Sequence, residues 1–262
     1  MTEDAKVKKI VAEADKKTKR TRAFFIFALV IIFAFFCVFA YFNFFNITEV
    51  NVILDSEDTY TKEEIFKSTG IALGDNLFEV KGRKIENELE KKHPYIKEAK
   101  VIKKPFTTVE VEITLDRAAM ALELADKFFL LSSTGKVLGT SEEMPETVCH
   151  IKVPYVKECI QGEQVLLDSE ETFNILMEIY SSFEENGINT YLTYLDITDK
   201  FNIKAVLDER FEVIFGSYEE IGAKTLLLKN VYKRDLWTDF SGIIDVFDAR
   251  EAAVRFTESM AN

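Results

Sequence analysis

The chain has 262 residues, of which 47% are hydrophobic and 30% charged, a composition typical of a globular protein that excludes a largely disordered one. Its formal net charge of −12 argues against a nucleic-acid partner, because proteins that bind the phosphate backbone present a basic face. The charge is uneven: residues 1–22 hold eight basic and four acidic side chains, so the remainder carries −16. We therefore expect a basic N-terminal tail and an acidic main body.

A run of twenty residues without a charged side chain, 23–42, follows the basic tail. A helix of that length rises about 30 Å, the thickness of a hydrocarbon core. Lys and Arg beside such a helix hold that end in the cytoplasm. A cleaved signal peptide is the rival interpretation, but this run is long and leaves through bulky residues such as Tyr41 and Phe44. The sequence predicts an uncleaved transmembrane helix over 23–45, a cytoplasmic tail over 1–22 and an extracytoplasmic remainder.

The first segment after this helix is predicted to form, in order, a strand, two helices and two strands. The strands are expected over 47–54, 97–103 and 106–115, the last with strict alternation of apolar and polar residues from 108. Thr61 and Glu64 form a capping box that opens the first helix, which ends at Gly70. The second helix is expected over 82–92 and is stopped by Pro94.

Beyond residue 117 the pattern changes to strands and hairpins interrupted by two longer helices. Residues 128–131 and 136–138 flank a hairpin loop, 201–207 and 211–215 form a second pair, and 242–247 is the last strand. One helix is expected to start at Asp168 and end at Gly187, and the other to open with a capping box of Ser217 and Glu220. The segment is predicted to be α+β with a mainly antiparallel sheet.

Residues that could carry catalysis or hold a metal are few. The two histidines do not occur in H-E-x-x-H spacing, and Cys149, His150 and Cys159 are too loosely spaced to indicate a metal site. Ser133 and Lys136 match S-x-x-K, but they fall in the expected hairpin rather than on a helix. We predict no enzyme, no cofactor and no metal, and leave open whether the two extracytoplasmic cysteines form a disulfide.

Several motifs in fixed order carry a family resemblance. They are T-K-E-E-I at 61–65, G-I-A-L-G-D-N-L-F at 70–78, H-P-Y-I at 93–96, F-L-L-S-S-T-G-K-V-L at 129–138 and G-I-I-D-V-F at 242–247. Together with the N-terminal anchor they resemble the FtsQ/DivIB family of bacterial cell-division proteins, over almost everything from 23 to 256. One departure is D-R-A-A at 116–119, where the family has Glu-Arg-x-Pro.

The resemblance implies the fold and its division. The expected architecture is α+β: a single N-terminal transmembrane helix, a POTRA domain of β-α-α-β-β order, and a mainly antiparallel β domain with two helices. The corresponding ranges are 1–22 for the basic cytoplasmic tail, 23–45 for the transmembrane helix, 46–116 for the POTRA domain, 117–248 for the β domain and 249–262 for a C-terminal tail.

The resemblance also implies a function. Such proteins are non-enzymatic scaffolds of the divisome, held in the cell membrane at the division septum, that link early division proteins to septal peptidoglycan synthesis. The implied partners are the bitopic proteins FtsB/DivIC and FtsL, with other septal divisome proteins. A partner strand is expected to add to the last strand of the β domain. The implied contact residues are Ile243, Ile244, Asp245, Val246, Phe247, Ala249, Val254 and Phe256.

Two other function classes remain open at this stage. One is an extracytoplasmic sensor or ligand-binding module, although residues 1–22 are too few for a signalling domain. The other is a membrane-anchored cell-wall enzyme, which the sparse set of catalytic side chains disfavours.

Overall fold

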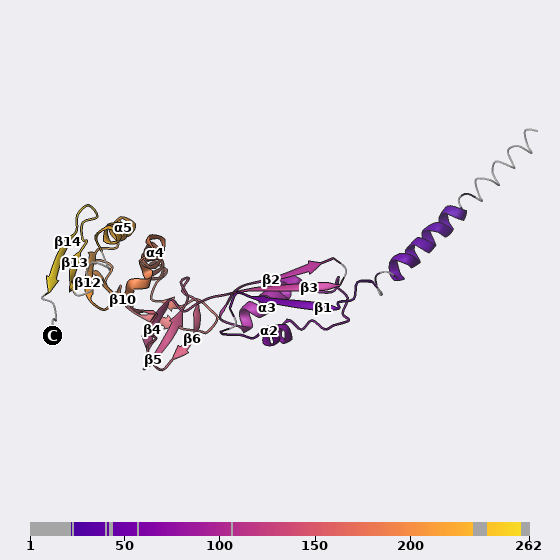
Figure 1. The fold of residues 1–262 in the computed structure, drawn as a ribbon, viewed down its shortest axis with the longest axis horizontal. Helices are drawn as coiled ribbons and strands as arrows, with labels where there is room; N and C mark the ends of the chain where they lie inside the picture. The colour runs from indigo at the N-terminus through magenta and orange to yellow at the C-terminus, as the bar shows by residue number, and fades with distance from the viewer. Residues whose placement is uncertain are drawn as a thin grey trace, which may run out of the picture. The chain divides into compact units, whose positions relative to one another are not determined.

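The computed structural model describes the greater part of the chain (Figure 1). The chain divides into two compact units. The first comprises Met1–Ile53, Tyr60–Glu86 and Lys100–Glu112, and the second Leu54–Thr59, Asn87–Ala99 and Ile113–Asn262. The described residues are 22, 24–39, 41, 44–56, 58–105, 107–232 and 240–257.

The predicted membrane helix is described only in part. Residues 24–39 are helical, while residues 23, 40, 42 and 43 and nearly all of the predicted basic tail lie outside the described residues. Within the described ranges, no helix combines the length and the apolar character needed to cross a bilayer. The membrane span over 23–45 therefore stays a prediction.

A three-stranded sheet with two helices follows, in the predicted order β-α-α-β-β. Its strands lie in the order β1-β3-β2. The capping box is confirmed: Thr61 Oγ1 accepts from the Glu64 amide, Glu64 accepts from the Thr61 amide, and Gly70 ends the helix with φ 67°. The elements are β1 (Glu49–Leu54), α2 (Lys62–Thr69), α3 (Gly82–Lys92), β2 (Ile96–Lys104) and β3 (Thr108–Leu115).

Alternation along β3 sets the buried face of this sheet. Val109, Val111 and Ile113 are at most 2% exposed, while Glu110 and Glu112 between them are partly accessible. This period of two is what a strand with one buried face requires. The predicted inward set of β3 is therefore the one that the structure buries.

A nine-stranded sheet forms most of the remainder, in the order β14-β13-β12-β11-β10-β7-β4-β5-β6. Five of its eight pairings are antiparallel, in line with the predicted mainly antiparallel sheet, while β4–β7, β7–β10 and β12–β13 are parallel. The strands are β4 (Met120–Leu124), β5 (Lys127–Leu131), β6 (Val137–Ser141), β7 (Cys149–Lys152), β10 (Leu192–Asp196), β11 (Ile203–Leu207), β12 (Phe211–Gly216), β13 (Ser241–Asp245) and β14 (Ala253–Thr257).

Smaller elements complete the described chain. A two-stranded ribbon joins β8 (Val156–Glu158) to β9 (Leu166–Leu167), and a 3₁₀ turn, η1 (Asn189–Tyr191), precedes β10. The predicted hairpin at 128–138 is confirmed as β5 and β6, with Gly135 at φ 80° in its loop. Ser133 and Lys136 therefore lie in and beside a turn, not one helical turn apart.

Helices α4 (Glu170–Asn186) and α5 (Ile221–Val231) pack on one face of the large sheet (Figure 1). Ser169, not Asp168, caps α4, since its hydroxyl accepts from the Thr172 amide. The capping box predicted for α5 is wrong, because Glu220 takes a left-handed conformation at φ 56° and no side chain caps the helix. The sheet face under these helices and their apolar stripes form a single core that includes Leu176, Phe183, Leu195, Ala205, Phe215, Leu228 and Ile244.

The C-terminal part of this sheet differs from the prediction. The expected last strand, 242–247, is shorter and ends at Asp245. A further strand, β14, forms within the range predicted to be a tail. The segment is short, and its only sequence signal is the alternation of Val254 and Phe256 with Arg255 and Thr257.

Candidate partner-binding edge strand

Strand β13, which was predicted to offer an open edge, lies inside the sheet. It pairs in parallel with β12 and antiparallel with β14. The Gly242 amide donates to the Arg210 carbonyl at 3.1 Å, and the Val246 amide to the Ile214 carbonyl at 3.0 Å. The prediction of an unpaired edge at 242–247 is therefore wrong, because both sides of this strand are used within the chain.

Among the residues that the structure describes, the outermost strand at this end of the sheet is β14. Successive residues of a strand direct their amides and carbonyls to opposite sides. The amides of Gly242 and Val246 point to β12, so the backbone groups of Ile243, the residue after Gly242, point to β14. Ile243 is paired there with Arg255, whose backbone groups therefore point back to β13. The next residue, Val254, therefore directs its amide and carbonyl away from β13, toward the outer side of the strand. An edge of this kind is a template for a further strand.

The opposite edge of the sheet, β6, is covered by another segment of the chain. The Val137 amide donates to the Glu163 carbonyl at 2.8 Å, and the Val137 carbonyl accepts from the Gly162 amide at 2.8 Å. The Gln161 side-chain amide donates to the Leu138 carbonyl at 2.9 Å. Of the two ends of this sheet, β14 is therefore the better candidate for pairing with another chain.

The side chains of β14 give its core face an aromatic character. Val254 and Phe256 lie opposite Ile244 and Gly242, so they share the face that carries the core. The Phe256 ring centroid is 6.3 Å from that of Phe211, yet the side chain is 48% exposed. An incoming strand would therefore find a partly exposed aromatic beside the backbone groups of the edge.

The connection between β13 and β14 is fixed by a buried lysine. Lys224 is only 4% exposed, and its Nζ donates to the carbonyls of Phe215 at 3.0 Å and Ser217 at 2.8 Å. The same nitrogen lies 5.8 Å from the centroid of the Phe247 ring. The Phe247 ring in turn lies so close over Gly216 that a Cβ there would approach it to 2.2 Å. This packing holds the chain where it turns from β13 toward β14.

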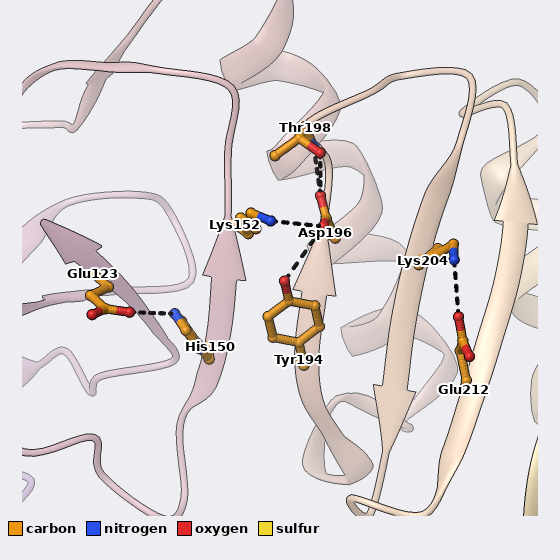
Figure 2. Close-up of polar contacts among 8 residues, drawn as sticks. All are labelled: Glu123, His150, Lys152, Tyr194, Asp196, Thr198, Lys204 and Glu212. Carbon is orange, nitrogen blue, oxygen red and sulfur yellow. Dashed lines mark hydrogen bonds and ion pairs between the residues drawn. The ribbon is translucent and has the colours of Figure 1, made fainter.

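The sheet face that α4 and α5 leave uncovered is polar, and its side chains largely bind each other (Figure 2). Lys204 Nζ lies 3.1 Å from Glu212 Oε1, between adjacent strands. Lys152 Nζ lies 3.8 Å from Asp196 Oδ2, and the Tyr194 hydroxyl donates to the same oxygen at 3.4 Å. Cross-strand pairs of this kind are typical of a solvated face. The edge, rather than this face, is therefore the stronger candidate for protein binding.

Asp196 is the best-connected carboxylate on this face. Burial alone would raise its pKa, but hydrogen bonds from the Thr198 hydroxyl at 2.6 Å and amide at 2.9 Å, together with Lys152, lower it overall. The carboxylate therefore stays ionised and tied to its neighbours, a structural arrangement rather than a poised acid or base.

The thiols and histidines give no catalytic arrangement in the described chain. Cys149 and Cys159 are both free, so they form no disulfide with each other. Burial raises the pKa of Cys149 and raises that of Cys159 to about 11, which leaves both thiols protonated and weakly reactive near neutral pH. No group of three or more metal-binding side chains occurs among the described residues.

The predicted contact residues fall into three places. Ile243, Ile244 and Asp245 lie in the interior strand β13, with Ile244 fully buried. Those in the connection after it are Val246, Phe247 and Ala249, and those on the edge strand are Val254 and Phe256. Sequence reasoning missed Gly242 and Lys224, because neither a close backbone approach nor a buried lysine leaves a local pattern.

Comparisons with known proteins identify the first domain. Residues 45–114 match the family model described as POTRA domain, FtsQ-type. No curated protein matches the chain.

Among solved structures, the chain is similar to the major extracytoplasmic domain of the trans isomer of the bacterial cell division protein DivIB from Geobacillus stearothermophilus. That match has 10% identity, covers 42% of this chain and 85% of that one, and has a TM-score of 0.28. So low a TM-score does not establish a shared fold, and the identification rests on the family model. Residues 45–114 of this chain therefore form a POTRA domain of the FtsQ type.

Proposed function

We propose that this protein is a non-enzymatic scaffold of the bacterial divisome that binds an extended segment of a bitopic division protein on strand β14. The proposed partners are FtsB/DivIC-like and FtsL-like proteins. The uncharged run over 23–42 would anchor the chain in the cell membrane at the septum, with the two sheets outside. Through other septal divisome proteins, the scaffold would link early division proteins to septal peptidoglycan synthesis.

The observation that carries this proposal is the geometry of the edge. The backbone groups of Val254 point away from β13, while the opposite edge at β6 is covered by residues 161–164. An added strand would take its affinity from main-chain hydrogen bonds and its register from alternate side chains. Phe256, 48% exposed, supplies an aromatic anchor of the type that dominates protein interfaces.

The test uses proline at two adjacent positions. Val254→Pro removes an outward amide and leaves the pairing with β13, so the protein should fold and lose affinity for the FtsB/DivIC-like ectodomain by about tenfold or more, equivalent to 1.4 kcal/mol. Arg255→Pro removes an amide that faces β13 and should instead loosen β14 itself.

Val254→Ala is the matched control, because it trims the side chain and keeps the amide. It should bind nearly as well as the wild type. Titration of the full-length chain in detergent or nanodiscs gives the affinities, and circular dichroism checks the fold. Equal affinity of folded Val254→Pro and wild type would remove β14 as the docking strand.

A further inference from the structure

A short loop of the first unit is held against the chain where it leaves the apolar helix. Residues 71–79, here called the juxtamembrane loop, connect α2 to α3. The Leu77 amide donates to the Phe45 carbonyl at 2.7 Å, and the Asn76 side-chain amide to the Tyr41 carbonyl at 2.7 Å. The Ile47 amide donates to the Asp75 carbonyl at 2.8 Å. These bonds tie the loop to Tyr41, Phe45 and Ile47, at the C-terminal end of the helical residues 24–39, 41 and 44.

The same loop presents large apolar side chains to the outside. Phe78 stacks on Tyr41 with ring centroids 5.8 Å apart and lies 4.8 Å from the Phe45 ring, yet it is 58% exposed. Leu73 is 64% exposed and Phe44 57%. Single exposed apolar residues are ordinary, but a group of them rimmed by polar residues marks an interaction surface.

The position of this loop next to the apolar helix indicates that lipid covers its exposed apolar side chains. If the run over 23–42 spans the bilayer, Tyr41, Phe44 and Phe45 lie at the depth of the lipid headgroups, and the hydrogen bonds bring the juxtamembrane loop to the same depth. Amphipathic aromatic rings favour this zone. The exposed side chains of Lys81 and Arg83 follow directly and suit anionic headgroups.

We propose that the juxtamembrane loop inserts Leu73 and Phe78 into the interfacial layer of the bilayer that holds the apolar helix. This surface is separate from the β14 edge and binds lipid rather than protein. The inference rests on the membrane anchoring in the proposed function. It gives the first unit a second attachment to the membrane, in addition to the apolar helix that precedes it in the chain.

Tryptophan fluorescence tests this directly. The chain has one tryptophan, Trp237, so a Trp237→Phe background leaves only an introduced probe. Leu73→Trp reports on the loop, and Phe201→Trp is the control, because Phe201 is equally exposed at 64% but lies between β10 and β11. Both full-length variants are reconstituted in phosphatidylethanolamine–phosphatidylglycerol vesicles that contain lipid brominated near the top of the acyl chains.

We expect blue-shifted emission and strong quenching for Leu73→Trp, and little quenching for Phe201→Trp. Phe78→Trp serves as a second probe that conserves the aromatic ring and should behave like Leu73→Trp. Equal quenching of loop and control probes, in protein that floats with the vesicles, would overturn the insertion and leave the anchor intact. Protein that fails to float with vesicles would contradict the membrane anchor, and the insertion with it.

Discussion

Gly242 lies directly opposite Phe256 across the β13–β14 pair, at a point where the two backbones approach unusually closely. A Cβ on Gly242 would come within 2.2 Å of the Arg255 carbonyl oxygen and 3.0 Å of the Phe256 Cα. Real Cβ atoms do not tolerate such contacts with backbone, which cannot move as a flexible side chain does. The absence of a side chain at position 242 therefore allows the edge strand to dock.

Gly242→Ala should force β14 away from β13 and destabilise this end of the sheet by about 1–3 kcal/mol, the usual effect of overpacking. Hydrogen exchange should speed up at the amides of Ala253, Arg255 and Thr257, which face β13. Gly222→Ala is the control: a Cβ there meets nothing within 4 Å, and alanine in helix α5 should stabilise by about 0.5–1 kcal/mol. Unchanged exchange at these three amides in Gly242→Ala would show that the close approach is not required.

Lys224→Met should weaken the connection that leads into β14. The change leaves the carbonyls of Phe215 and Ser217 without the donor that Nζ supplies, at a cost of about 1–3 kcal/mol. Denaturant unfolding measures this loss. A variant as stable as the wild type would mean that water replaces both hydrogen bonds.

The same lysine predicts a pH dependence. Burial lowers the pKa of Lys224, although Glu220, Glu219 and Asp248 oppose the shift, so the unfolded chain keeps this proton to higher pH than the folded chain. The contribution of Lys224 to the free energy of unfolding therefore rises with pH between its lowered pKa in the folded chain and its pKa of 10.5 in the unfolded chain. The stability difference between wild type and Lys224→Met should increase from neutral pH toward 10.5, and a flat difference would contradict the shift.

The core of the three-stranded sheet gives a stability test. Ile113 is 2% exposed, so Ile113→Asp buries a carboxylate and should destabilise by about 4 kcal/mol or more, enough to unfold the three-stranded sheet. Glu112→Lys, on the accessible face of β3, should change stability by no more than about 0.5 kcal/mol. Thermal unfolding by circular dichroism compares the two, and a stable Ile113→Asp would mean that the inward face is misassigned.

Local signals predicted the first sheet well. The helix over 82–92 and the alternation of β3 depend on neighbouring residues, as does the Thr61–Glu64 capping box, and each is present in the structure. Such features are encoded within a few residues, and no distant contact is needed to form them.

Features that depend on distant residues were not predictable in the same way. The parallel pairing of β12 with β13 joins segments separated by helix α5, and β14 approaches β13 closely at Gly242, where a Cβ would meet its backbone. Ser217 and Glu220 have the spacing of a capping box, but Glu220 adopts φ 56° and the Ser217 carbonyl binds Lys224 instead. Tertiary contacts override the local pattern at these points.

The measurement that tests the proposed docking most directly is the exchange of single amides in β14 with and without partner. Saturating FtsB/DivIC-like ectodomain should slow the Val254 amide, which faces outward, and leave the Arg255 amide, already directed at β13, nearly unchanged. Protection of the outward amide without further protection of the inward one is specific to an added strand. Exchange at Val254 that stays the same when the partner is bound would contradict strand addition at β14.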